Sequence, residues 1–192
     1  AHQENNVLGQ AGNSFSNLIG LQIKATILSV IGPDRDGDII RNLVEATGAD
    51  PRNLIVDPKT RTTVKTRYMS GHQQVLRVDV DGTRTCPADI EDLLVARASD
   101  LIPTQDAIIL SDYGYHHLTD RLIRHIITCA NERNIPVLVD PRGHDLSKYK
   151  GATLATPNRK ELSEATGGMV TESDADVIKA AEKLMAESGI HA

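Results

Sequence analysis

The chain has 192 residues, a formal net charge of −5, 40% hydrophobic residues and only 3% aromatic ones. This length fits one domain with a core of aliphatic side chains. The negative charge argues against a general nucleic-acid-binding surface, and no apolar run reaches the roughly 18–20 residues that span a bilayer, so we expect neither nucleic acid nor a membrane as a partner.

The first part of the chain alternates helical and extended patterns. After a glycine-punctuated turn, Phe15, Leu18 and Ile19 recur at the spacing of one helical face. Gly48 is a natural stop for a later helix, because glycine readily adopts the left-handed conformation that ends helices. The expected elements are a helix after the turn at 9–13, a buried strand at 24–30, a helix at 38–47 and a short strand at 53–56.

Two alternating segments, 62–69 and 73–80, flank the turn at 70–72. This pattern is typical of a β-hairpin with charged residues on one face. Because the hairpin interrupts the alternation of strands and helices, we expect it to form a small sheet that projects from the main domain.

The hairpin carries several side chains that suit an anionic ligand. In an extended strand Lys65 and Arg67 share one face, as do Gln73 and Arg77. The pattern fits either a polar lid over an anionic sugar or an ordinary solvated sheet face.

The second half of the chain has a regular β–α rhythm, which is typical of an α/β fold. Thr171 and Asp174 resemble a capping box at the start of the final helix. Residues 189–191 resemble the approach to a further strand. The expected elements are a helix from about 85 to 99, strands at 107–111, 135–140 and 152–156, and helices at 118–133, 158–166 and from about 174 to 188.

Polar residues follow the three strands of this second half. In open α/β sheets ligands bind off the carboxyl ends of the strands. Asp112 could accept a hydrogen bond from a substrate hydroxyl, or form only a local Asx turn. Arg142 could bind an anion through two hydrogen bonds, or remain a surface loop residue.

Asn158 and Glu161 lie three residues apart at a predicted helix start. An amide and a carboxylate at that position suit a hydrated Mg²⁺ and a phosphate. The alternative is a simple helix cap followed by an ordinary first-turn acid. Near the other end of the chain, the turn at Gly9 would let the backbone approach a ligand closely, with Asn13 hydrogen-bonding to hydroxyls.

The two cysteines, Cys86 and Cys129, are far apart in the sequence and match no metal-binding or redox spacing. We therefore expect two reduced thiols, which is typical of a cytoplasmic protein.

In order along the chain, these pieces resemble the ribokinase-like (PfkB) carbohydrate kinases, and among them most closely the D-glycero-β-D-manno-heptose-7-phosphate kinases. The resemblance covers nearly the whole chain, and its most specific part runs from Val139 to Glu161. The residues that carry it are Gly9–Asn13, Thr63–Arg67, Gln73–Asp79, Leu110–Tyr113, Val139–Asp145, Tyr149–Leu154 and Thr156–Glu161.

The resemblance implies a three-layer α/β ribokinase-like sandwich with a small β-sheet lid. Residues 1–192 would form one partial domain of this kind, with the lid contributed by about 53–82. It further implies a kinase that uses ATP and Mg²⁺ to phosphorylate O1 of heptose 7-phosphate in the synthesis of the lipopolysaccharide core precursor. A homodimer that pairs through the lids is also expected.

The resemblance also implies roles for single residues. Asn13, in the turn that begins at Gly9, would hold sugar hydroxyls. The lid residues Lys65, Arg67 and Arg77 would meet the substrate phosphate, and Gln73 would also contact the substrate. Asp112 would lie near the path of the transferred phosphate, while Asn158 and Glu161 match the family's N-x-x-E motif, which organises Mg²⁺ and phosphate.

The family's G-A-G-D motif, which supplies the anion hole and the catalytic Asp, does not occur in this sequence. We therefore expect the catalytic Asp beyond Ala192 and no activity from these 192 residues alone. Two alternatives remain: a non-catalytic homologue that binds a sugar phosphate, and a kinase of the same family that acts on another sugar or a nucleoside.

Overall fold

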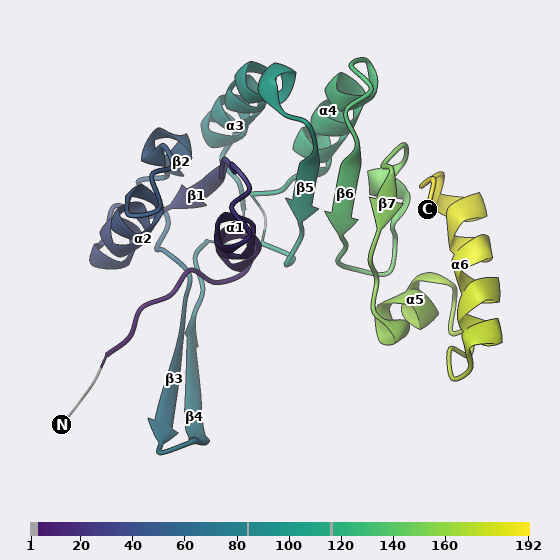
Figure 1. Ribbon diagram of the computed structural model, residues 1–192, viewed down its shortest axis with the longest axis horizontal. Helices are drawn as coiled ribbons and strands as arrows, with labels where there is room; N and C mark the ends of the chain where they lie inside the picture. The colour runs from purple at the N-terminus through teal and green to yellow at the C-terminus, as the bar shows by residue number, and fades with distance from the viewer. Residues whose placement is uncertain (1–3, 84, 116) are drawn as a thin grey trace. The chain divides into compact units, whose positions relative to one another are not determined.

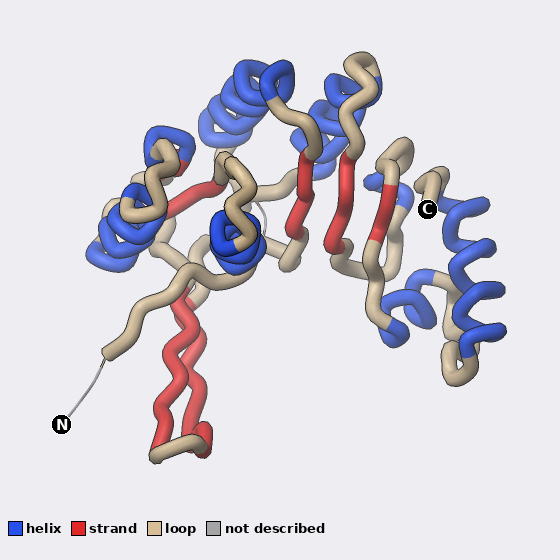
Figure 2. The backbone as a smooth tube through the Cα atoms, in the orientation of Figure 1, coloured by secondary structure: helices blue, strands red, loops and turns tan. Residues whose placement is uncertain are grey.

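The computed structural model describes residues 4–83, 85–115 and 117–192. The chain divides into two compact units, Ala1–Ile90 and Glu91–Ala192. Figure 1 traces both units in chain order, and Figure 2 marks their helices and strands.

The first unit contains a short parallel strand pair and a separate long hairpin. β1 pairs in parallel with β2, and β3 pairs in antiparallel fashion with β4. The elements of this unit are α1 (Ala11–Gly20), β1 (Ser29–Ile31), α2 (Arg35–Glu45), η1 (Pro51–Asn53), β2 (Leu54–Val56), β3 (Val64–Ser70) and β4 (Gln73–Val80).

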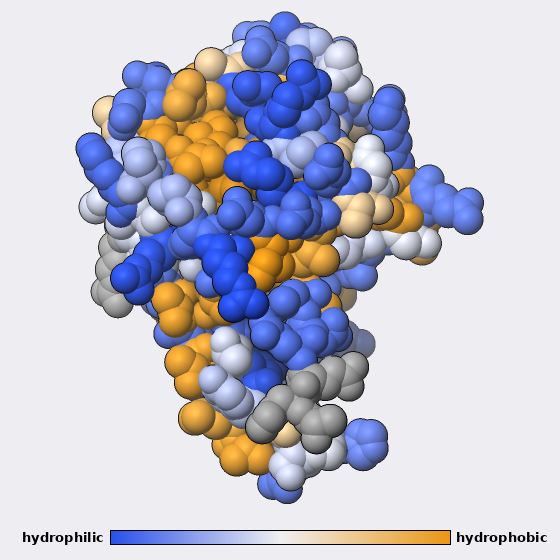
Figure 3. Space-filling model, turned by 90° about the vertical axis from the view of Figure 1, so that its left-hand side faces the viewer, coloured by the Kyte–Doolittle hydropathy of each residue, from blue (hydrophilic) through white to orange (hydrophobic). Residues whose placement is uncertain are grey.

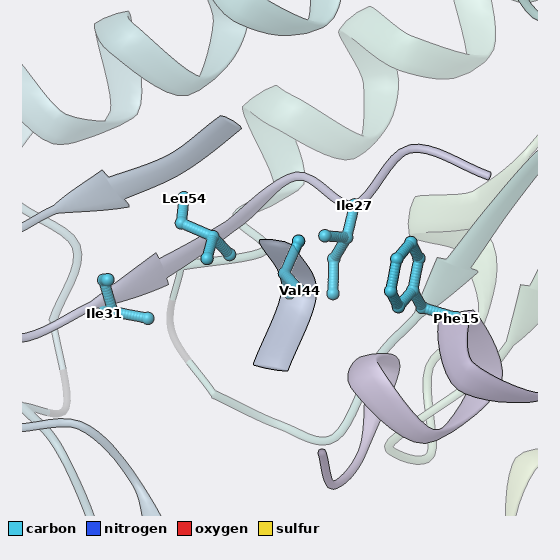
Figure 4. Close-up of a cluster of buried hydrophobic side chains, with 5 residues drawn as sticks. All are labelled: Phe15, Ile27, Ile31, Val44 and Leu54. Carbon is cyan, nitrogen blue, oxygen red and sulfur yellow. The ribbon is translucent and has the colours of Figure 1, made fainter. Parts of the chain in front are cut away.

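The core of the first unit is aliphatic apart from one phenyl ring. Side chains from α1, α2 and both parallel strands meet in one buried cluster (Figure 4). Each large apolar side chain that leaves water in this way contributes about 1.5–3 kcal/mol, so the cluster holds the helices on the strands. Its members are Phe15, Ile27, Ile31, Val44 and Leu54.

Two element boundaries in this unit differ from the prediction. A strand is predicted at 24–30, but the observed strand β1 is shorter and lies later in the chain, because only Ser29–Ile31 pairs with β2. β2 itself ends before Pro58, which has no N–H to continue a ladder. The helix predicted from residue 38 begins at Arg35 instead, because Asp34 caps it by accepting a hydrogen bond from Gly37 N at 2.9 Å.

The second unit is a three-stranded parallel sheet with helices, in the order β5-β6-β7. α3, which starts at the end of the first unit, supplies most of its length to the second. The elements are α3 (Ala88–Leu101), η2 (Ile102–Thr104), β5 (Ile108–Ser111), α4 (Asp120–Asn131), β6 (Val137–Asp140), η3 (Ser147–Tyr149), β7 (Leu154–Ala155), α5 (Arg159–Ala165) and α6 (Asp174–Ser188).

The central strand, β6, and the helix α4 form the most buried part of this unit. Val137 and Val139 of β6 are buried, as is Ile123 of α4. Thr119 caps α4 by accepting a hydrogen bond from Leu122 N. The apolar residues of α4 fall on one face, as the period of 3.6 requires. The buried residues of this helix are Leu122, Ile123, Ile126, Ile127 and Ala130.

The last residues of the chain lie along the edge of β7, as the approach to a further strand predicted. Gly151 N donates to Gly189 O at 2.9 Å, His191 N to Ala152 O at 3.0 Å, and Ala155 N to Ala192 O at 2.8 Å. Ile190 is buried between these bonds.

The cap of α6 was predicted two residues too early. Thr171 instead donates its hydroxyl to Arg159 O at 3.1 Å. The capping box is formed by Ser173 and Asp176, whose side chains each accept a hydrogen bond from the other's backbone N–H. Among the described residues, none of the helices has both the length and the apolar character needed to cross a membrane.

Candidate functional site

The parallel register of the second unit brings the polar strand ends together. Ser111 is the register partner of Asp140, and Asp112 N donates to Asp140 O at 3.0 Å. Asp112 and Asp140 therefore lie at the same edge of the sheet. The α5 N-terminus contributes to this region, because Arg142 Nη1 lies 3.9 Å from Glu161 Oε1.

Asp112 is nearly buried and accepts three hydrogen bonds. Its Oδ1 accepts from Gly114 N at 2.7 Å, which makes the Asx turn that sequence reasoning kept as an alternative. Its Oδ2 accepts from Lys148 Nζ at 2.7 Å and from Tyr149 Oη at 2.6 Å. The side chain is only 3% exposed. Asp112 thus ties together the loops after β5 and β6, and is not an open acceptor for a substrate hydroxyl.

Tyr149 and Lys148 are partners that the sequence did not reveal. Tyr149 is fully buried, and its Oη also accepts from Arg142 N at 3.3 Å. Burial, followed by the hydrogen bond to Asp112, raises the pKa of the Tyr149 hydroxyl far above its ordinary value, so it stays a donor. Lys148 Nζ lies 4.9 Å from the centre of the Tyr149 ring. Together they fix the start of the loop that carries Arg142.

Asp140 is a further acid of this edge, at one of the polar strand ends, to which the sequence assigned no role of its own. Burial raises its pKa, and the negative charges of Glu161 and Asp112 raise it further, against a hydrogen bond with Tyr113 that lowers it. Asp140 is the last residue of β6 and is followed by Pro141 and Arg142. This position at a strand end is what in the sequence indicates a place at the ligand-binding edge. The acids at this edge repel one another, so a cation here would be stabilised.

Asn158 and Glu161 form a complete capping box on α5. Asn158 Oδ1 accepts from Lys160 N and Glu161 N, each at 3.0 Å. Glu161 Oε2 accepts in return from Asn158 N at 2.9 Å. Asn158 and Glu161 therefore cap the helix, as the alternative interpretation of the sequence predicted. The second carboxylate oxygen of Glu161, Oε1, faces Arg142.

A polar hollow of about 230 Å³ lies in front of this box. It contains side chains of both signs, which suits a phosphate together with a cation. His144 Nδ1 and Lys160 Nζ each lie 3.8 Å from a carboxylate oxygen of Glu164. The lining residues are Arg142, Gly143, His144, Asn158, Lys160, Glu161 and Glu164.

The donor set of this hollow fits Mg²⁺ better than a metal enclosed by protein ligands. In the described part of the chain, three or more His, Cys, Asp or Glu side chains do not gather into one metal cluster. Mg²⁺ commonly keeps several waters and binds through one or two carboxylates plus substrate phosphates. Glu161 and the Asn158 amide match that pattern. Asp140 lies beside them, and its pKa is raised first by burial and then by the negative charges of Glu161 and Asp112.

In the first unit, Gly9 and Asn13 lie at the start of α1. Gly9 O accepts from Gly12 N, and Gln10 O accepts from Asn13 N, each at 2.9 Å. Gln10 has a positive φ of 54°, an uncommon conformation for a side chain other than glycine. Both Gly9 and Asn13 are exposed, so this turn presents backbone and one amide to solvent.

The hairpin has one basic face. Lys65 is paired across the strands with Asp79, and Arg67 with Arg77. Lys65 Nζ lies 3.2 Å and Arg77 Nε 2.9 Å from carboxylate oxygens of Asp79. Among the described residues, Arg67 makes no such ion pair. The face therefore carries a net positive charge around one shared acid.

The prediction that Gln73 shares this face with Arg77 is wrong. A bulge shifts the register after Tyr68, so that Met69 pairs with Gln74 and Ser70 with Gln73. One extra residue in β4 reverses the alternation of its side chains. Gln74, rather than Gln73, is thus in line with Arg77 and Arg67.

The opposite face of the hairpin is apolar and open to solvent. Three successive cross-strand pairs build it: Val64 with Val80, Thr66 with Val78, and Tyr68 with Leu76. Figure 3 shows this apolar surface along the hairpin, at the lower end of the view. A contiguous apolar face on an exposed sheet is typical of an interaction surface. The large exposed members are Tyr68, Leu76, Val78 and Val80.

Comparison with known sequences gives one consistent family. The sequence profile described as "pfkB family carbohydrate kinase" matches residues 1–190. The chain is 37% identical to the "Bifunctional protein HldE" of Geobacter metallireducens, over 96% of the chain and 38% of that protein. It is 42% identical to the Caulobacter vibrioides protein of the same name, over 90% of the chain and 35% of that protein. The chain thus spans a little over a third of the length of these relatives.

Solved structures agree on the fold. Phosphofructokinase-2 from Escherichia coli, in its tetrameric inhibited form, superposes with a TM-score of 0.66 at 21% identity, over 90% of this chain and 56% of that one. Ribokinase from Giardia lamblia superposes with a TM-score of 0.65 at 16% identity, over 85% of this chain and 50% of that one.

The charge on Glu161 is expected to hold up the pKa of Asp140. Glu161→Gln preserves the capping box but removes the charge, and should therefore lower the pKa of Asp140. An NMR titration of the side-chain carboxyl carbon of Asp140 measures this pKa. Glu164→Gln, on the same helix, is the matched control and should leave that pKa near its wild-type value. Equal effects of the two variants would mean that Glu161 has no special coupling to Asp140.

Proposed function

The chain belongs to the pfkB family of carbohydrate kinases and has the ribokinase-like three-layer α/β fold, and on that premise we propose that it carries the substrate-binding part of a heptose 7-phosphate kinase. Residues 1–192 would form one partial domain, with a lid contributed by about 53–82. The similarity to the HldE proteins supports this choice of sugar.

The observation that carries the proposal is the basic face of the lid. Lys65, Arg67 and Arg77 lie on adjacent positions of one exposed sheet face. A sugar that already bears a phosphate offers the dianion that such a face binds, and arginine matches phosphate oxygens with two parallel hydrogen bonds. Asp79 holds Lys65 and Arg77 in place by exposed ion pairs, which are weak enough for a phosphate to compete with them.

The proposed reaction moves the γ-phosphoryl group of ATP to O1 of D-glycero-D-manno-heptose 7-phosphate, for synthesis of the lipopolysaccharide core precursor in the cytoplasm. Asn13, beside Gly9, would hydrogen-bond to sugar hydroxyls. Asn158 and Glu161 would hold Mg²⁺ through its waters, with Arg142 beside the phosphates. Bound Mg²⁺ would neutralise charge on the phosphate oxygens. Phosphoryl transfer depends mainly on such positioning and charge neutralisation.

Asp112 has a positioning role in this proposal. Its carboxylate is occupied by three donors, so it would set the loops that carry Tyr113 and Arg142 and would not bind the sugar itself. The proton acceptor for the sugar hydroxyl is expected outside the 192 residues, in the part of the protein that carries the G-A-G-D motif.

The full-length protein that contains this chain should phosphorylate heptose 7-phosphate, measured by coupled ADP release. Arg67→Ala should raise the KM for the sugar phosphate about tenfold to a hundredfold and leave the KM for ATP unchanged, because a charge-assisted hydrogen bond contributes about 1.5–3 kcal/mol. Lys24→Ala, which removes an exposed cation elsewhere in the unit, is the control. Turnover of fructose phosphate or a nucleoside but not of heptose phosphate would contradict the choice of substrate. Calorimetric binding of heptose 7-phosphate without turnover would identify a binding protein.

The apolar lid face supports a homodimer in which two lids pair. Leu76 is 53% exposed on this face, and pairing the face with a second copy would remove its apolar side chains from water.

Light scattering coupled to size-exclusion chromatography should give the mass of a dimer for the wild type and of a monomer for Leu76→Glu. Leu93→Glu changes an equally exposed leucine, at 55%, on α3 and should remain dimeric. A monomeric wild type would rule out the lid-paired dimer.

A further inference from the structure

The base of the lid is fastened to the N-terminus of α2 by one carboxylate. Asp34 Oδ1 accepts from Gly37 N at 2.9 Å and so caps the helix. Its other oxygen, Oδ2, accepts from Thr62 N at 2.8 Å, two residues before β3 begins. The same side chain therefore fixes both a helix start and the arm that leads into the lid.

A second hydrogen bond of Thr62 completes a closed ring of contacts between Gly32, Asp34 and Thr62. It is buried, and its Oγ1 accepts from Gly32 N at 2.9 Å. The ring leaves no space for additional side chains. A Cβ on Gly37 would lie 2.3 Å from Gly32 O, and one on Gly32 would lie 2.9 Å from Thr62 N. The two glycines thus permit the close approach that the hydrogen bonds require.

The returning arm of the lid is tied to the outgoing arm. Thr60 Oγ1 accepts from Thr83 N at 2.8 Å, and Thr63 Oγ1 accepts from Gly82 N at 3.3 Å. A Cβ on Gly82 would lie 2.7 Å from Arg61 O. Both arms therefore move together, and Asp34 holds the pair through Thr62.

Asp34 is well suited to hold this position as an anion. Burial alone would raise the pKa of its carboxyl, but hydrogen bonds from Thr62 and Gly37 and the charge of Arg61 outweigh burial and lower it. The helix dipole also favours a negative charge at this end of α2. The carboxylate is therefore charged at neutral pH.

Within a single copy of the chain, the lid has little else to hold its direction. Residues 65–80 are all exposed, so the strands beyond the base are not packed into the core of their unit. A hairpin of this kind is oriented by the bonds at its base.

We propose that Asp34 is a positioning residue that directs the basic face of the lid toward the substrate phosphate. The identity of the ligand, a sugar phosphate, rests on the proposed function. The role of Asp34 in orienting the lid does not, because it is a property of the chain without ligand. Asp34 would act through Thr62 and would not touch the substrate.

The orienting role can be measured without a substrate. Two spin labels report the lid direction as a distribution of the distance between them. One is attached to His72→Cys at the lid turn and the other to Glu45→Cys on α2. Cys86→Ser and Cys129→Ser remove the native thiols that would also react with the label. Asp34→Asn keeps the shape but leaves one acceptor oxygen for the two N–H groups of Gly37 and Thr62, and should broaden that distribution. Asp36→Asn, also in the first turn of α2, is the matched control and should keep it narrow. An unchanged distribution in Asp34→Asn would overturn the proposal.

Kinetics on the full-length protein test the consequence for binding. Asp34→Asn should raise the KM for the sugar phosphate about tenfold to a hundredfold, with kcat and the KM for ATP nearly unchanged, because small misplacements of binding groups have effects of this size. A merely destabilised protein would instead lose kcat at unchanged KM values, and that result would contradict the positioning role.

Thr62 provides a second, milder pair of variants. Thr62→Ser keeps the hydroxyl that accepts from Gly32 N and should behave as wild type in both measurements. Thr62→Val removes that acceptor but keeps the backbone N–H that donates to Asp34, so it should broaden the distance distribution less than Asp34→Asn does. A distribution for Thr62→Val as broad as that for Asp34→Asn would mean that the hydroxyl bond, rather than Asp34, holds the lid, and would overturn the proposal. If the wild type does not use heptose 7-phosphate, the proposed function fails, and the spin-label result still decides whether Asp34 orients the lid.

Discussion

A carboxylate that is partly or wholly removed from water needs hydrogen-bond donors around it, and this constraint acts in both units of the protein. Asp34 in the first unit and Asp112 in the second each accept from backbone N–H groups and from a second loop. Each lies just after a parallel strand, where the chain leaves the sheet. The loops that carry the proposed ligand-binding residues are therefore held at their origins by acids that accept several hydrogen bonds.

Local periodicity was enough to predict most of the elements. The helices α2 and α4 and the strands β5 and β6 follow from apolar residues at helical or strand spacing, and the hairpin from alternation around a glycine turn. These patterns depend only on neighbouring residues. The same reasoning found Asn158 and Glu161, because a cap and its partner are three residues apart.

Contacts between distant loops could not be predicted in this way. Lys148 and Tyr149 reach Asp112 across 36 and 37 residues, from a loop with no periodic pattern. Gln73 was assigned to the wrong face because alternation counts residues and cannot detect a bulge. The Asp34–Thr62 bond joins segments 28 residues apart, and only the glycines around it hinted at a close approach.

The capping box and the proposed metal site on α5 are compatible. Capping occupies one oxygen of Glu161 and leaves the other directed at Arg142, where the acids of the sheet edge accumulate negative charge. A helix start can thus stabilise the fold and still present an oxygen ligand. This would explain why a residue pair that reads as an ordinary cap also fits a phosphate-bound cation.

The most direct test of this account is a crystal structure of the full-length protein with heptose 7-phosphate, Mg²⁺ and a non-hydrolysable ATP analogue. We expect the phosphate of the sugar to lie against Arg67 on the lid, and Mg²⁺ with its waters to lie beside Glu161. A sugar phosphate bound away from the hairpin, or a metal bound away from the start of α5, would contradict it.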